Sequence, residues 1–289
     1  MKTNEKTKIA FFGTSKFAVG VLEELKKTAS QLLPDLIITT PDKPAGRKLK
    51  LTPPPIKIWA DRNKIKTLQP EKLDEKFFEE LKNFLSQPWG LFIVTAYGKI
   101  IPQFILDLPK FGTLNVHPSL LPKLRGATPI HSALLKNEQE TGVSIILLDN
   151  KMDHGPIIAQ ERFQLYQNSI SELPTKSELE KNLAKLGGRM LGEIIPQWLN
   201  NEIETTKQIH DQATYTKKLA TTDSLIDFND KAELNFKKIQ AFDTWPKAHF
   251  FQNGKRIIIK KAHLEKDELI IDRIISEGGQ EINYSDLSK

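Results

Sequence analysis

The fold class is set near the N-terminus by residues 8–40, which read KIAFFGTSKFAVGVLEELKKTASQLLPDLIITT. Residues 8–12 are mainly apolar and predict a buried strand, and residues 13–15 follow as a turn with a glycine. Residues 17–25 then carry apolar side chains at helical spacing, and residues 36–40 predict a second strand. A strand–helix–strand unit favours a parallel sheet with helices on its faces, so we expect a Rossmann-like α/β domain.

Strands and helices continue to alternate along most of the chain. Further strands are expected at 64–68, 91–96, 112–117, 143–148 and 156–163. Further helices are expected at 56–63, 74–85, 129–136 and 177–200, the last weakened or kinked by two glycines and a proline.

The C-terminal part has a different pattern. Residues 202–227 are polar and rich in Thr, which predicts a linker, and residues 232–242 predict a short helix. Short strands are then expected at 248–252, 256–262 and 269–275, with Asn253-Gly254 as a hairpin turn. We therefore expect an α/β domain over residues 1–207, followed by a linker and a reduced, OB-like β-barrel domain over residues 208–289.

The composition limits the kinds of protein that this can be. Of 289 residues, 39% are hydrophobic and none is Cys, so a packed core is expected while disulfide scaffolds, iron–sulfur clusters and thiolate zinc sites are excluded. No apolar run has the length of a signal peptide or a membrane span, so we expect a cytoplasmic protein without membrane attachment. The net charge of +6 resides in residues 1–207, because residues 208–289 carry 13 basic and 13 acidic side chains. A moderately basic protein favours polyanionic partners.

Part of the basic charge is concentrated in residues 41–55, which read PDKPAGRKLKLTPPP. The prolines exclude a continuous helix or a central strand and predict a long loop. Four basic side chains face a single acid, Asp42, and they are Lys43, Arg47, Lys48 and Lys50. The loop is either an ordinary solvated surface or a phosphate-contacting segment, and the local sequence leaves both open.

Asn115 and His117 are the first candidates for chemistry. They alternate along a predicted strand and so share one face, at the strand's carboxyl end, where open α/β sheets bind ligands. Asn can donate to an oxyanion and His can also move a proton, while Asp153, in a turn between two later strands, can orient His117. A strand-end Asn beside a hydrogen-bonded His, and an ordinary turn Asp, remain the alternatives.

The sequence lacks the motifs of several other kinds of catalytic or binding site. The six His residues show no metalloprotease spacing, so no metal site is expected. Dinucleotide-binding, phosphate-loop and nucleophile-elbow motifs are also absent. Covalent catalysis and nucleotide hydrolysis are therefore disfavoured, and the residues fit direct attack of an amine on an acyl carbon. Residues 119–126 form a nonperiodic run that either walls a ligand pocket or is a surface loop.

A longer pattern surrounds these candidates. Residues 115–130, NVHPSLLPKLRGATPI, are followed by ETGV at 140–143 and MDHG at 152–155. This order and spacing resembles the formyltransferases that use 10-formyltetrahydrofolate. The resemblance implies an enzyme with that folate as formyl donor, no metal, and three catalytic residues, namely Asn115, His117 and Asp153. It also implies folate contacts from Ser119, Leu120, Leu121, Pro122, Tyr97 and Gly98.

Two further stretches are similar to the methionyl-tRNA formyltransferases in particular. They are the basic loop with PPPIK at 53–57, and the segments ATYTKK at 213–218 and AFDTWP at 241–246. The resemblance implies tRNA contacts from Arg47, Lys43, Lys48, Lys50, Lys217 and Lys218. The chain departs from the family pattern at Lys48, His154 and Asp243-Thr244, and its C-terminal part is shorter by on the order of 20 residues than the small-barrel pattern.

The resemblance thus implies formyl transfer from 10-formyltetrahydrofolate to the α-amine of methionyl-initiator tRNA, in translation initiation, by a monomer. The amine attacks the formyl carbon, Asn115 and His117 stabilise the oxyanion, His117 carries the proton, and Asp153 positions the imidazole. Two alternatives stay open. One is a formyltransferase that acts on an amino sugar nucleotide or another small amine, and the other is a non-catalytic tRNA- or folate-binding protein.

Overall fold

The computed structural model describes residues 6–46, 49–136 and 138–287, and its chain folds into two compact units. The first unit comprises Met1–Arg125, Val143–Glu161 and Lys181–Thr214. The second unit comprises Gly126–Gly142, Arg162–Glu180 and Tyr215–Lys289. Among the described residues, no helix is both long enough and apolar enough to cross a membrane.

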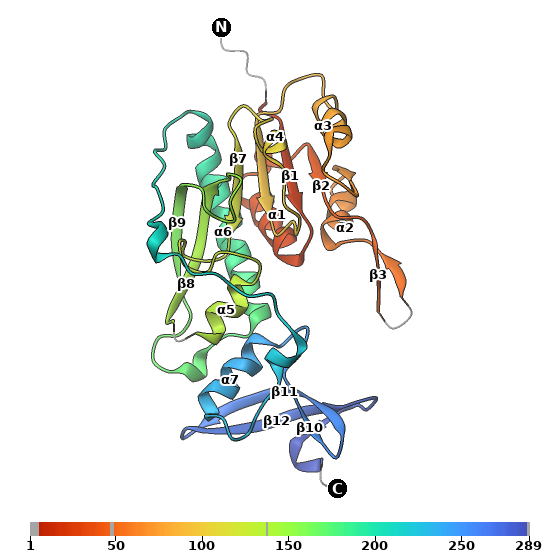
Figure 1. The fold of residues 1–289 in the computed structure, drawn as a ribbon, viewed down its shortest axis with the longest axis vertical. Helices are drawn as coiled ribbons and strands as arrows, with labels where there is room; N and C mark the ends of the chain where they lie inside the picture. The colour runs from red at the N-terminus through yellow and green to blue at the C-terminus, as the bar shows by residue number, and fades with distance from the viewer. Residues whose placement is uncertain (1–5, 47–48, 137, 288–289) are drawn as a thin grey trace. The chain divides into compact units, whose positions relative to one another are not determined.

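A seven-stranded sheet organises the first unit (Figure 1). In spatial order its strands are β5 (Lys66–Leu68), β2 (Leu36–Ile38), β1 (Ile9–Gly13), β6 (Leu91–Thr95), β7 (Thr113–His117), β8 (Glu140–Leu147) and β9 (Ile157–Gln164). The first five run parallel and β8 runs antiparallel to β7. The predicted mostly parallel, Rossmann-like sheet is therefore confirmed. The order along the sheet reverses between β1 and β6, the kind of position where open α/β sheets bind ligands.

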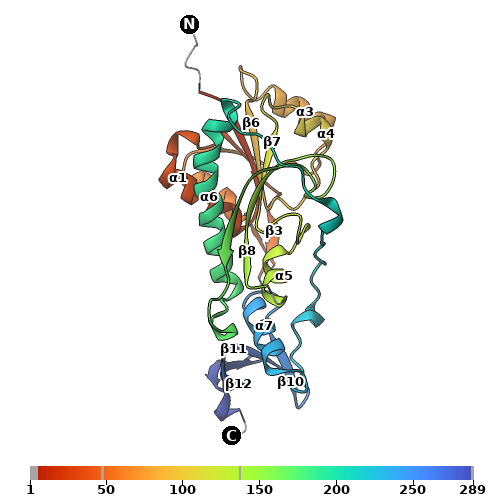
Figure 2. The same cartoon turned by 90° about the vertical axis from the view of Figure 1, so that its left-hand side faces the viewer.

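Helices cover both faces of this sheet, as Figure 2 shows for α1 and α6 on one side and α3 and α4 on the other. Their bounds are α1 (Lys16–Thr28), α2 (Pro55–Arg62), α3 (Glu75–Lys82), α4 (Gln103–Leu106) and α6 (Lys176–Leu199). Helix α2 packs beside α1. The helix positions follow from the strand alternation, because Ala10 and Phe12 of β1 point into the core beneath α3 and α4.

The predicted long helix is the single helix α6, which continues through Gly187, Gly188 and Pro196. A Cβ atom at Gly188 would collide with the backbone carbonyl oxygen of Val21 in α1. One at Gly187 would collide with the side chain of Val116 in β7. The two glycines therefore let α6 approach α1 and the sheet closely.

The proline-rich segment contains more structure than the predicted loop. Strands β3 (Lys43–Ala45) and β4 (Lys50–Thr52) form a two-stranded antiparallel ribbon, in which Pro44 lies opposite Leu51. A two-stranded ribbon has no central strand, so a proline can occupy it without removing an interior hydrogen bond. The prolines exclude a central strand, as predicted, but they permit this ribbon.

The second unit contains a four-stranded antiparallel sheet together with α5 (Pro129–Leu135) and α7 (Ala232–Ala241). Its strands, in order, are β10 (His249–Gln252), β11 (Lys255–Glu265), β12 (Glu268–Ser276) and β13 (Glu281–Asn283). Asn253 and Gly254 have φ of 50° and 74° and form the predicted hairpin turn. The β-rich C-terminal part is confirmed as an antiparallel sheet; its described strands pair in chain order, and no pairing of β10 with β13 closes them into the expected OB-like barrel. Strand β13 was missed in the sequence analysis.

The segment predicted as a linker, residues 202–227, has little regular structure. It contains two 3-10 helices, His210–Gln212 and Thr221–Ser224, and other 3-10 helices in the part of the chain that the structure describes are Ser30–Leu32, Ile170–Glu172 and Tyr284–Asp286. The segment up to Thr214 is nevertheless part of the first unit, where Thr206 pairs with Ile157 through two backbone hydrogen bonds of 2.8 Å. This packing distinguishes it from a free linker.

Candidate active site

Strand β7 presents Asn115 and His117 on one face of the sheet. Val116, between them, contacts the α6 side near Gly187, so its two neighbours point to the opposite face. Both side chains are polar and yet buried, with exposed fractions of 8% for Asn115 and 4% for His117. Buried polar groups need hydrogen-bond partners, and those partners define the site.

Asp153 provides the first partner. It lies in the turn between β8 and β9 with φ of 46°, in the left-handed region that a non-glycine residue rarely adopts. The amide Nδ2 of Asn115 donates to Asp153 Oδ1 at 3.3 Å, and Nδ1 of His117 lies 3.6 Å from the same oxygen. The structure therefore brings the three predicted catalytic residues together around one carboxylate oxygen.

The second partner of His117 is a backbone carbonyl. Its Nε2 lies 3.0 Å from the carbonyl oxygen of Leu124. A carbonyl only accepts hydrogen bonds, so Nε2 carries the hydrogen and, in the neutral ring, Nδ1 keeps its lone pair. Nδ1 is then a proton acceptor, and a proton bound there is stabilised by Asp153. Asn115 retains a second amide hydrogen that can reach an oxyanion.

The run after β7 is anchored by side chains that the sequence analysis did not single out. Ser144 of β8 donates to the carbonyl of Ser119 at 2.6 Å and accepts from the backbone N–H of Leu121 at 3.1 Å. Gln160 donates to Ser144 Oγ and to the Leu121 carbonyl. The Ser119 hydroxyl donates to the carbonyl of Lys123 within its own turn. Ser119 and Leu121 are thus committed to the loop's internal structure.

The other predicted folate contacts differ in what they offer. Leu120 and Pro122 are half-buried and keep apolar surface beside the loop. The ring of Tyr97, in contrast, packs edge-on against Phe12 in the core, and burial raises the pKa of its phenol. Only the backbone of Tyr97 is left for a ligand, together with Gly98, whose φ of 79° favours glycine.

The basic ribbon is tied to the sheet through Asp42. Its carboxylate accepts from Gln69 at 2.7 Å and pairs with Lys57 at 3.0 Å. The hydrogen bond from Gln69, and then that from Lys57, hold the pKa of Asp42 below its usual value. Lys43 and Lys50 are exposed on the two strands. The acid of the loop thus anchors it, while these lysines face solvent.

The remaining predicted tRNA contacts fall into two groups. Arg47 and Lys48 lie outside the described residues. Lys217 and Lys218 are exposed and belong to the second unit, where the Thr128 hydroxyl donates to the Lys217 carbonyl at 2.7 Å.

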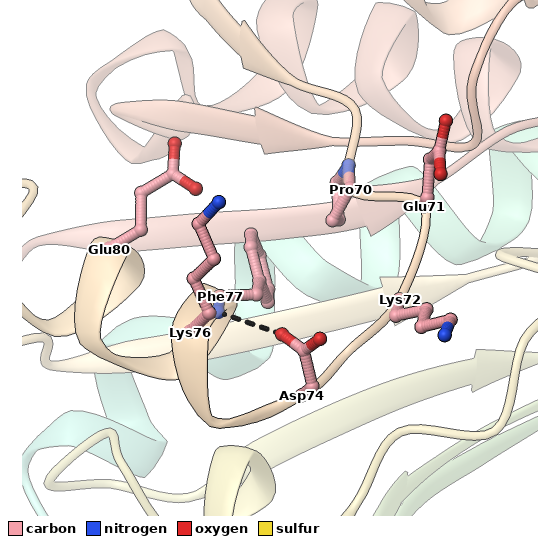
Figure 3. Close-up of a pocket in the computed structure, with 7 residues that line it drawn as sticks. All are labelled: Pro70, Glu71, Lys72, Asp74, Lys76, Phe77 and Glu80. Carbon is pink, nitrogen blue, oxygen red and sulfur yellow. Dashed lines mark hydrogen bonds between the residues drawn. The ribbon is translucent and has the colours of Figure 1, made fainter.

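A surface depression of about 350 Å³ lies elsewhere, at the start of α3 (Figure 3). It is lined by Pro70, Glu71, Lys72, Asp74, Lys76, Phe77 and Glu80. The Asp74 carboxylate accepts from the backbone N–H of Phe77 and caps the helix. The charged residues that line the depression are mixed in sign, and none of the predicted site residues is among its lining residues.

Comparison with known proteins gives a consistent result. The formyl transferase family matches residues 7–195, and the formyl transferase C-terminal domain matches residues 218–283. A methionyl-tRNA formyltransferase of Chloroflexus aurantiacus is 39% identical over 258 residues, which are 88% of this chain and 79% of that protein.

Solved structures with the same fold include two formyltransferases of different substrates. The methionyl-tRNA formyltransferase from Clostridium thermocellum has a TM-score of 0.62 at 16% identity, over 96% of this chain and 99% of that chain. An N-formyltransferase from Helicobacter canadensis, in complex with folinic acid and dTDP-3-aminofucose, has a TM-score of 0.62 at 23% identity, over 90% and 88% of the two chains. These structural likenesses concern the fold.

Proposed function

Because this chain belongs to the formyl transferase family, we propose that it transfers the formyl group of 10-formyltetrahydrofolate to the α-amine of methionyl-initiator tRNA. The observation that carries this proposal is the cluster of Asn115, His117 and Asp153 at the carboxyl end of β7. The reaction needs an oxyanion donor and a proton acceptor side by side, and this cluster supplies both.

The neutral amine attacks the formyl carbon and a C–N bond forms, while the formyl oxygen gains negative charge. Asn115 donates its remaining amide hydrogen to that oxygen. Nδ1 of His117 takes the proton lost by the attacking nitrogen, and Asp153 stabilises the resulting imidazolium. The ring returns this proton to the folate nitrogen as the second C–N bond breaks, which releases tetrahydrofolate and the formylated amine.

In this proposal Asn115 and His117, the two expected oxyanion donors, act at different stages of the reaction. In the neutral ring, the N–H of His117 is already bound to the Leu124 carbonyl. The early stabilisation of the oxyanion therefore falls to Asn115, and His117 becomes a donor there only after Nδ1 binds a proton.

The folate and the tRNA are assigned to different surfaces. We place the folate against the apolar surface of Leu120 and Pro122 and the backbone of Tyr97 and Gly98, and Ser119 and Leu121 shape this surface from inside the loop. The exposed lysines 43, 50, 217 and 218, with Arg47 and Lys48, are assigned to the phosphates of the tRNA. Within the described residues, no group of three or more His, Cys, Asp or Glu side chains is arranged to hold a metal. We propose a chemistry that proceeds through side chains alone.

Further assignments rest on the same proposal. We assign residues 1–207 to the formyltransferase domain and residues 208–289 to the linker and the reduced C-terminal domain, with the first linker residues, up to Thr214, packed in the first unit. The enzyme acts as a monomer in the cytoplasm, where translation begins.

The test is formyl transfer from 10-formyltetrahydrofolate to charged initiator tRNA, with uncharged initiator tRNA and charged elongator tRNA as controls. Turnover selective for the charged initiator is expected. Turnover on a small amine such as an amino sugar nucleotide, with none on the tRNA, would favour the fold's other substrate class, and folate binding without any turnover would favour a binding protein.

A further inference from the structure

We propose that Gln208 and Thr214, at the two ends of the segment 208–214, are positioning residues that hold the catalytic histidine in its working orientation. The proposal rests on the catalytic role given to His117 above. The sequence analysis placed these residues at the start of a linker. In the structure, Thr214 contacts the turn of Leu124 and Gln208 contacts the turn of Asp153, and these two turns supply the partners of the His117 ring.

Thr214 fixes the first of these turns. The backbone N–H of Leu124 donates to Thr214 Oγ1 at 2.9 Å, and the N–H of Arg125 donates to the Thr214 carbonyl at 2.8 Å. The N–H of Thr214 donates in return to the Pro122 carbonyl at 3.3 Å. Leu124 has φ of 60°, a conformation that a leucine rarely keeps without external support. These bonds aim the Leu124 carbonyl at Nε2 of His117.

Gln208 joins this turn to the turn of Asp153. Its Nε2 donates to the carbonyls of Asp153 and Gly155 at 2.9 and 2.7 Å. Its Oε1 accepts from Nη2 and Nε of Arg125 at 2.6 and 3.2 Å. Gln208 and Arg125 are 5% and 1% exposed, so water does not replace these bonds readily. A glutamine suits this place because it combines two donor hydrogens with an acceptor.

These contacts determine which ring nitrogen of His117 carries the hydrogen. If the Leu124 carbonyl is held in place, Nε2–H is the favoured tautomer and Nδ1 is left as the base. If either turn moves, the ring can rotate or change tautomer, and the base no longer faces the reacting amine. Misplacement of a catalytic group by about 1 Å costs on the order of 10² in rate.

Two conservative variants test the two contacts separately. Thr214→Val keeps the shape but removes the acceptor for Leu124 N–H, and Thr214→Ser retains that acceptor as its matched control. Gln208→Glu keeps an acceptor for Arg125 but loses both donors to the Asp153 and Gly155 carbonyls. Gln212→Glu, at an exposed position in the same segment, controls for the added charge.

We expect Thr214→Val and Gln208→Glu to lower kcat by about 10- to 100-fold, with KM for the folate and the tRNA within about twofold. Nitrogen NMR of the imidazole, assigned by its loss in His117→Gln, is expected to show Nε2–H in the wild type and a mixture in both variants. Thr214→Ser and Gln212→Glu keep the wild-type values. Circular dichroism checks that each variant is folded.

Wild-type kcat in both variants, or a fall in kcat with an unchanged ring tautomer, would overturn the positioning role. The NMR readout requires no tRNA. If the wild type fails to formylate methionyl-tRNA, the proposed substrate is wrong, while the tautomer comparison still decides whether this segment positions His117.

Discussion

Polar side chains serve two different purposes in the first unit, at the carboxyl end of β7 and on the ribbon β3–β4. Asn115 and His117 are buried and bonded to fixed partners, whereas Lys43 and Lys50 are exposed at the surface. A buried, hydrogen-bonded group acts through the orientation of its hydrogen bonds, and solvent and salt have little access to it. An exposed charge acts through the field that it adds at a distance, and dissolved ions screen it. The two regions should therefore fail in different ways when altered.

The largest effect on kcat is expected in the buried cluster, at Asn115. Asn115→Ala removes the oxyanion donor and should lower kcat by ~10²–10³, which corresponds to about 3–4 kcal/mol of transition-state stabilisation. The loss should be independent of salt. The measurement is steady-state kinetics with both substrates, and Asn200→Ala, at an exposed position directly after α6, is the control. A loss below about fivefold would remove Asn115 from the mechanism.

A half-buried histidine with a buried, unbonded ring nitrogen shows what burial does when hydrogen bonding is missing. Nε2 of His131, in α5, has no hydrogen-bond partner among the described residues. Burial, and then the charge of Lys176, lower its pKa from 6.5 to about 4. A lowered histidine pKa means that the unfolded chain binds the proton more tightly. The contribution of neutral His131 to the free energy of unfolding is therefore fully present above pH 6.5. It falls by roughly 3 kcal/mol as the pH drops toward 4.

Replacing the titrating group should flatten this dependence. In His131→Gln, the free energy of unfolding should fall less steeply between pH 6.5 and 4 than in the wild type, because the share contributed by His131 is removed. Urea unfolding at several pH values measures it, with His263→Gln on β11 as the control. If the wild type and His131→Gln share the same slope, His131 is not buried neutral in solution.

The ribbon should give a smaller effect that depends on salt. Lys43→Ala with Lys50→Ala should raise KM for the tRNA about tenfold, and should reduce the dependence of log KM on log salt by about 2, since each lost phosphate contact contributes about 0.9. Arg47→Ala is measured in the same way. KM for the folate should stay unchanged in all of these variants. Lys82→Ala, exposed on α3, is the control. An unmoved tRNA KM would return the ribbon to an ordinary solvated surface.

The same contrast explains how much was predictable from sequence. Alternation along β7 places Asn115 and His117 on one face, because a strand's period of two is a local property. The partners of His117 are harder to predict. The Leu124 carbonyl is a backbone group that every residue type carries, so the sequence does not indicate that it binds the imidazole. Gln208 looks like any solvated glutamine in a polar segment, and its burial follows only from contacts with Arg125 and Asp153, each more than 50 residues away along the chain. The ribbon was missed because proline disfavours interior strands and not isolated pairs.

The smallest effect is expected where a predicted ligand contact lies in the core. The hydroxyl of Tyr97 is buried without a partner among the described residues, and its ring packs against Phe12. Tyr97→Phe removes an unsatisfied polar atom and keeps the ring, so the free energy of unfolding should stay equal or rise by about 1 kcal/mol. The KM for the folate should not change, because only the backbone of Tyr97 remains for a ligand. Phe12→Leu, which loses the ring contact, should instead destabilise the fold by about 1 kcal/mol. A raised folate KM in Tyr97→Phe would mean that the hydroxyl turns out of the core to meet the folate.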